Sequence, residues 1–150
     1  LSQLLEGARR HFGVSLLIDC HSMPSPRAPG VRTKAINNVD IVLGDCHGAS
    51  CSPEVTALAE RVLTEMGFQV VRNRPYAGGY ITRHYGHPEE GHHALQIEIN
   101  RALYMDERRI ERSPELPRLI RRITRLIKVL AEIDRDILKS DSRALPKAAE

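Results

Sequence analysis

The chain of 150 residues contains little cysteine and few aromatic residues. Its three cysteines, Cys20, Cys46 and Cys51, are an odd number and too few for a disulfide scaffold, so we expect a reducing, cytoplasmic location. Aromatic residues make up 4% and tryptophan is absent, so the core has to consist of Leu, Ile, Val and Ala. No apolar run approaches the ~20 residues of a membrane span, and no signal-peptide pattern is visible.

Strong charge of one sign is also missing. The net charge is +3, with 13 basic against 9 acidic residues in 101–150 and 9 against 10 in 1–100. A mild basic bias on a helical segment is usually a solvated face, so nucleic-acid binding is not expected. The length and the 41% hydrophobic content predict one globular domain over residues 1–150.

Hydrophobic periodicity predicts helices that alternate with strands. Helical spacing covers 1–12, about 53–66 and 120–137, and strand-like runs cover 14–19, 40–43, 69–72 and 94–100. Residues 22–38 and 73–93 are predicted to be irregular, and 140–150 to be a frayed polar end. The helix at 53–66 would connect two parallel strands. The pattern therefore predicts an α/β fold with a mainly parallel, mixed sheet.

The first candidate site follows the apolar run at residues 16–18, which ends in Asp19-Cys20-His21. In open α/β sheets, ligands and metals bind at the carboxyl ends of the strands. A neutral imidazole there, held by Asp19 or a backbone carbonyl, suits a zinc ligand. The alternative is a histidine that only hydrogen-bonds at the sheet edge.

Glu98 is the second candidate, in a strand where Leu95, Ile97 and Ile99 alternate with Gln96, Glu98 and Asn100. A surface strand would leave its carboxylate in solvent. A strand whose polar face looks into a site would instead desolvate the carboxylate and raise its pKa, so that it could accept a proton from metal-bound water.

The third candidate is the loop at 73–86, which holds two arginines, Arg74 and Arg83, three tyrosines and two adjacent glycines. Arginine can bind a carboxylate with two hydrogen bonds, and glycine allows close approach of backbone N–H groups. The alternative is a mobile surface loop with salt bridges. Cys46-His47 with Cys51 lacks a CxxC pair, which disfavours a thiolate zinc site, whereas Asp45 and His47 suit a supporting or substrate contact.

Four segments together resemble the N-formylglutamate amidohydrolase (N-formylglutamate deformylase) family over roughly residues 5–135. They are DCHSMP at 19–24, DIVLGD at 40–45, NRPYAGGYIT at 73–82 and QIEINRALYM at 96–105. The resemblance implies a three-layer α/β/α sandwich around a mixed sheet, similar to zinc carboxypeptidases.

In that family a zinc ion is held by a His and a Glu of an early motif and by a later His at a strand end. The resemblance implies that His21 is the later histidine, that Glu98 is the general base, and that Arg74 and Arg83 bind substrate carboxylates. No HxxE sequence precedes His21. We therefore expect that an amino-terminal part is missing, and that the chain alone binds metal weakly and is inactive.

The leading hypothesis is a Zn²⁺-dependent amidohydrolase that cleaves the N-formyl or a related N-acyl amide of glutamate or a similar acidic amino acid, as in histidine breakdown. Ser22 or Asn73 would hydrogen-bond the tetrahedral oxyanion, and Tyr76 would contact the substrate. Its partner would be a small molecule, with no nucleic acid and no membrane. The alternative is a non-catalytic binding domain that uses a basic carboxyl-terminal helix to bind nucleic acid or a protein.

Overall fold

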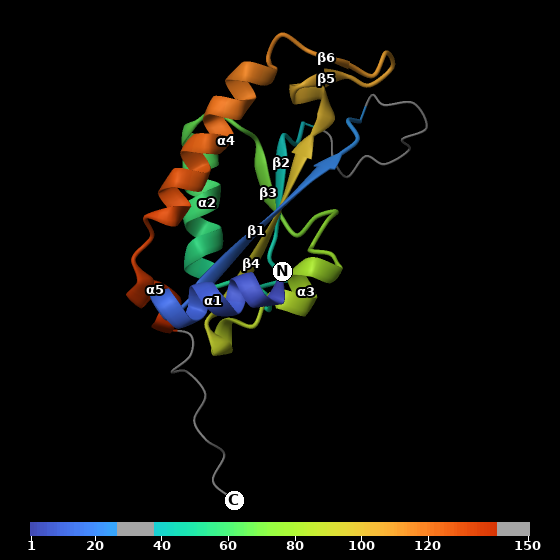
Figure 1. Ribbon diagram of the computed structural model, residues 1–150. Helices are drawn as coiled ribbons and strands as arrows, with labels where there is room; N and C mark the ends of the chain where they lie inside the picture. The colour runs from blue at the N-terminus through green and yellow to red at the C-terminus, as the bar shows by residue number, and fades with distance from the viewer. Residues whose placement is uncertain (27–37, 141–150) are drawn as a thin grey trace, which may run out of the picture.

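The computed structural model describes residues 1–26 and 38–140, and its centre is a mixed four-stranded sheet (Figure 1). The strands are β1 (Ser15–Met23), β2 (Ile41–Gly44), β3 (Val70–Arg72) and β4 (His92–Asn100), in the order β1-β4-β2-β3. β1 pairs with β4 and β2 with β3 in parallel, whereas β2 and β4 are antiparallel. The predicted loop at 22–38 and the predicted polar end at 140–150 lie largely outside the described residues.

The predicted crossover helix between two parallel strands is confirmed as α2 (Pro53–Glu65), which connects β2 to β3. Ser52 caps it, because its hydroxyl accepts a hydrogen bond from the backbone N–H of Glu54 at 3.3 Å. Pro53 occupies the first turn, where no intrahelical N–H bond is lost.

The hydrophobic core lies between one face of the sheet and the helices α2 and α4 (Leu116–Ala131). Alternation along β2 and β4 turns their odd-numbered apolar side chains to this face, while helical spacing turns one stripe of each helix inward. The fully or almost fully buried members include Ile41, Leu43, Leu95, Ile97, Val55, Ala59, Leu63, Leu126 and Leu130. Burying a Leu or Ile side chain contributes about 1.5–3 kcal/mol.

Two helices contact the opposite side of the sheet, which confirms the three-layer α/β/α arrangement (Figure 1). α1 (Ser2–Phe12) packs against β1, and α3 (Tyr80–Tyr85) packs against β4 and β1. This face of β1 and β4 carries polar side chains instead of a continuous apolar core, and it holds the candidate site.

Several predicted boundaries were wrong. β1 continues to Met23, so His21 and Ser22 lie inside the strand. The region 73–93 contains α3 and the short 3₁₀ helix η1 (Pro88–Glu90). The long helix predicted at 120–137 is two helices, because α4 ends at Ala131 and Asp134 caps α5 (Arg135–Ser140) by accepting from the N–H of Asp136 at 2.9 Å.

A small hairpin follows the last long strand and was not predicted. The 3₁₀ helix η2 (Arg101–Leu103) leads into β5 (Met105–Asp106), which pairs antiparallel with β6 (Glu111–Arg112). The Asp106 carboxylate shapes the turn, because it accepts from the backbone N–H groups of Arg108 and Arg109 at 2.9 and 3.1 Å.

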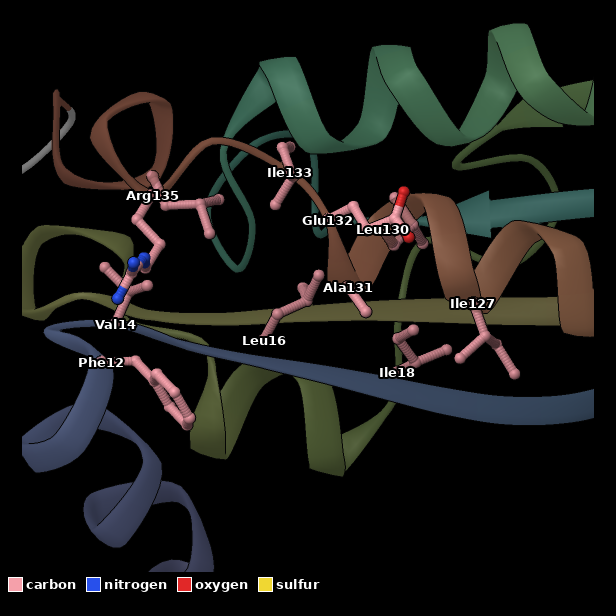
Figure 2. A pocket seen from close by; sticks show the side chains of 11 residues that line it. Phe12, Val14, Leu16, Ile18, Ile127, Leu130, Ala131, Glu132, Ile133 and Arg135 are labelled. Atoms are coloured by element: carbon pink, nitrogen blue, oxygen red, sulfur yellow. The ribbon is translucent and has the colours of Figure 1, made fainter.

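An apolar groove of about 630 Å³ runs along the core-facing side of β1, between Phe12 of α1 and the carboxyl end of α4 (Figure 2). Leu16 and Ile18 project into it from β1, opposite Ile127. Successive residues of a strand point to opposite faces, so this groove lies on the other side of β1 from Asp19 and His21. Its lining suits apolar groups, and it does not belong to the polar site.

No helix within residues 1–26 and 38–140 has the length and apolar character that crossing a bilayer requires.

Candidate active site

His21 and Glu98 are neighbours across the parallel β1–β4 pair. They are register partners, and each lies two residues before the end of its strand. The Nδ1 atom of His21 is 4.0 Å from Oε1 of Glu98, and the Nε2 atom is 3.1 Å from Oδ2 of Asp19. The imidazole therefore stands between two carboxylates on the polar face of the sheet.

Glu98 is not a solvated surface residue, because only 7% of it is exposed. Burial raises the pKa of Glu98, while the His21 imidazole and the hydrogen bond from Gln96 partly oppose this rise. The Nε2 atom of Gln96 donates to Glu98 Oε1 at 2.8 Å. A carboxylate with a raised pKa is a better proton acceptor at neutral pH, which suits a general base.

Asp19 leaves one buried acceptor without a hydrogen bond. Its Oδ2 lies at ion-pair distance from His21 Nε2, but the geometry makes no hydrogen bond, and no other described group donates to it. A buried carboxylate oxygen of this kind needs a positive partner or a donor. It is suited to fix the orientation of the His21 ring when that ring carries a charge or binds a cation.

The described residues provide one of the ligands that a zinc site needs, but they do not provide a complete set of protein ligands. Zinc sites in hydrolases use three protein ligands and an open position. Within residues 1–26 and 38–140, no group of three or more His, Cys, Asp or Glu side chains is placed to hold a metal ion. His21, whose side chain is 46% exposed, remains available as a single imidazole ligand.

The loop after β3 begins with Asn73, whose side chain holds the turn that follows β2. Its Nδ2 donates to Asp45 Oδ1 at 2.8 Å, and its Oδ1 accepts from the backbone N–H groups of Asp45 and His47 at 3.2 and 3.4 Å. The Asn73 amide is thus already used in the fold. Asp45 is buried and belongs to this structural network.

The remaining predicted substrate residues do not form one cluster with His21 and Glu98. Arg74 and Arg83 are exposed, and their guanidinium groups have no ion-pair or hydrogen-bond partner among the described residues. Tyr76 packs on the apolar cluster of Met23, Val39 and Val42 beside the site. The hydroxyl oxygen of Ser22 accepts from Nε of Arg101 at 3.2 Å, but Ser22 is the register partner of Ile99 and lies on the opposite face of β1 from His21.

Two residues near Glu98 had no role in the sequence-based prediction. Gln96 lies on the same strand face and contacts Glu98 directly. Arg101 follows β4 directly, and its positive charge slightly lowers the pKa of Glu98. The alternation of polar residues along β4 is the signal that could have identified Gln96; Arg101 had no comparable signal.

The fold and the site define an α/β domain with a carboxylate–imidazole–carboxylate cluster on the polar face of a mixed sheet. A sequence model described as N-formylglutamate amidohydrolase matches residues 1–105. The chain therefore belongs to the N-formylglutamate amidohydrolase family, as its four motif segments predicted.

Individual relatives agree with this assignment. The chain is 39% identical to N-formylglutamate deformylase of Pseudomonas aeruginosa over 108 residues, which cover 71% of this chain and 40% of that protein. It is 38% identical to the Pseudomonas putida protein of the same name, covering 71% and 39%. The crystal structure of N-formylglutamate amidohydrolase from Ralstonia eutropha JMP134 matches with a TM-score of 0.77 and 35% identity, over 91% of this chain and 49% of that one. The chain thus spans less than half the length of these relatives.

Proposed function

We propose that this chain provides the general-base half of a hydrolytic centre that cleaves the N-formyl, or a related N-acyl, amide of glutamate or a similar acidic amino acid. The observation that supports the proposal most directly is the pairing of Glu98 with His21 across β1 and β4, with 4.0 Å between Oε1 and Nδ1. Family membership and the names of the relatives support the substrate class.

In this proposal Glu98 accepts a proton from the attacking water and passes it to the departing amine. Burial raises the pKa of Glu98, which favours the first of these steps, acceptance of the proton from water. Arg74 and Arg83 bind the carboxylates of the substrate, since both guanidinium groups are unpaired among the described residues. The contacts favour neither Ser22 nor Asn73 as the donor to the oxyanion: Ser22 lies on the face of β1 opposite to His21, and the Asn73 amide is bound to Asp45.

The proposed cofactor is Zn²⁺, with His21 as one ligand and Asp19 as the group that orients its ring. Zinc would polarise the substrate carbonyl and lower the pKa of bound water from 15.7 toward about 7. The other ligands would have to come from outside the described residues. We place the reaction in amino-acid catabolism, in histidine breakdown, in the cytoplasm.

The alternative of a basic binding helix gains no support from the contacts of α4. Arg122 lies over the Phe68 ring at 3.9 Å, and Arg118 is 3.7 Å from Glu115. These are ordinary contacts of a solvated helix face. The alternative predicts salt-sensitive binding of nucleic acid without any metal requirement.

The test is formate release from N-formylglutamate by the complete gene product, together with its zinc content. We expect zinc-dependent release that Glu98→Gln abolishes while the bound zinc is retained. Glu89→Gln is the matched control, because Glu89 is exposed in η1. Near-normal turnover of Glu98→Gln, or a wild-type protein with neither formate release nor zinc, would refute the proposal.

A further inference from the structure

Two hydrogen bonds connect the arginine-containing loop to Glu98 through one side chain. The backbone N–H of Gly79 donates to Oε1 of Gln96 at 2.8 Å, and Nε2 of Gln96 donates to Oε1 of Glu98 at 2.8 Å. Gln96 is 4% exposed and precedes Glu98 by two residues, so both side chains lie on the same face of β4. Its carboxamide is therefore held at both ends inside the protein.

The chemistry of Gly79 determines which end of the carboxamide faces Glu98. A backbone N–H can only donate, so the group that faces it has to be the amide oxygen of Gln96. The NH₂ group then has to face Glu98. The ambiguity that usually affects the orientation of a glutamine side chain is removed here by its two neighbours.

The same bond makes the two oxygens of Glu98 different. Oε1 accepts from Gln96 and is the oxygen nearest to His21 Nδ1. Oε2 has no hydrogen-bond partner among the described residues. A proton taken from water would accordingly bind to Oε2.

The loop side of this connection has little room to move. A Cβ atom on Gly44 at the end of β2 would lie 2.9 Å from the backbone of Ala77 and Gly78. A Cβ on Gly78 itself would lie 2.6 Å from Cys46 Sγ and from Thr82 Oγ1. Backbone packing this close fixes the Gly79 N–H relative to the sheet, and with it the position of Gln96.

We propose that Gln96 is a positioning residue: anchored by the Gly79 N–H, it holds Glu98 by Oε1 so that Oε2 is the proton-accepting atom. The inference rests on the proposed function of Glu98 as general base. It also ties the position of the loop that carries Arg74 to that of the base, since Gly79 and Glu98 are bound to the same Gln96 carboxamide.

The first test needs no catalysis and uses the metal-free, ¹⁵N-labelled chain. Replacing Gln96 by Met, which keeps the length but removes both hydrogen bonds, should shift the Gly79 amide resonance. Replacing Glu98 by Gln should shift the side-chain NH₂ resonances of Gln96. If neither signal responds, the connection does not exist in solution and the inference is overturned, whatever the protein catalyses.

The second test separates positioning from mere stabilisation, and it uses formate release by the complete gene product. Gln96→Met should lower kcat by about 10²-fold, as expected for a displaced catalytic group, with KM changed less than about threefold. The Gln96→Glu variant keeps an acceptor for the Gly79 N–H but removes the donor to Glu98, so its kcat should fall by at least as much. This variant also tests the inference if Gln96→Met does not fold.

The matched control is Asn100→Leu on the same face of β4. Asn100 also makes two side-chain hydrogen bonds, to the carbonyl of Val39 and from the N–H of Ala102, but neither reaches Glu98. The Asn100→Leu substitution should lower the melting temperature and leave kcat unchanged. Equal kcat in Gln96→Met and wild type would overturn the inference, whereas shifted resonances without any formate release in the wild type would refute only the proposed function.

Discussion

Asp19 and Glu98 approach His21 from opposite sides, and the register of β1 against β4 is what brings them there. Glu98 is the register partner of His21, while Asp19 precedes His21 by two residues on the same face of β1. Parallel pairing places both strand ends at one edge of the sheet. Slipping this pairing by one residue would send Glu98 into the apolar core. The β1–β4 register is therefore the structural condition for the site.

Glu98 should make the metal-free protein less stable at neutral pH than its neutral variant. The pKa of Glu98 is raised in the folded protein by burial, so the folded state binds more protons than the unfolded state between the ordinary and the raised pKa. Stability therefore falls as pH rises through this window. In the presence of a metal chelator, the Glu98→Gln variant should have a higher melting temperature than the wild type at pH 7. At pH 3 the two melting temperatures should be the same. Glu89→Gln should show no pH-dependent gain, and a Glu98→Gln variant that melts lower than wild type at pH 7 would contradict the raised pKa.

Arg83 and Arg74 should affect substrate binding more than turnover. If each forms a two-point contact with a substrate carboxylate, Arg83→Ala should raise KM about tenfold or more with a smaller change in kcat. Lysine cannot reproduce the fork of two donors, so Arg83→Lys should also be impaired. Steady-state kinetics with N-formylglutamate measures both variants. Arg108→Ala, at an exposed position of the β5–β6 turn, is the control; an unchanged KM in both Arg83→Ala and Arg74→Ala would exclude the predicted role.

The sequence identified His21 and Glu98 as candidates because local patterns carried the information. Two apolar runs with polar residues near their ends indicated strands, and the alternation around Glu98 indicated which side chains share a face; the register that makes the two residues partners was not predicted. The predicted parallel pairing of the strands around 53–66 was confirmed for the same reason, since capping at Ser52 is local.

Features that depend on distant contacts were not predicted. β2 runs antiparallel to β4, so the turn after Gly44 does not lie at the edge where β1 and β4 end. The loop at 73–79 reaches the site by crossing the polar face, where Gly79 meets Gln96. Helix α3 begins after Gly79, which donates to Gln96 at 2.8 Å and accepts from Thr82 Oγ1 at 3.1 Å. None of these contacts is encoded in a local pattern.

Two adjacent residues of α4, Leu126 in the core and Ile127 near the surface, should contribute differently to the free energy of unfolding. Leu126 is completely buried, whereas Ile127 is 43% exposed at the groove beside β1 (Figure 2). Leu126→Ala should cost about 2–5 kcal/mol, because a cavity remains between α4 and the sheet. Ile127→Ala should cost less than about 1.5 kcal/mol, because much of that side chain already meets solvent. Urea unfolding measures the free energy of unfolding of both variants. Comparable losses of this free energy would mean that a partner covers the groove in solution.

Two glycines of contrasting environment test how tightly the loop is packed against the site. Gly78 has a φ of +129°, and a Cβ there would lie 2.6 Å from Cys46 Sγ and Thr82 Oγ1. Gly78→Ala should therefore lower the free energy of unfolding by about 1–3 kcal/mol, and it should shift the Gly79 amide resonance because the strain is relieved by moving the loop. Gly7 lies inside α1 with nothing within 4 Å of its Cβ position, so Gly7→Ala should stabilise by about 0.5–1 kcal/mol. A Gly78→Ala variant as stable as wild type would show that the loop adjusts freely, which would remove the mechanical link between Arg74 and Glu98.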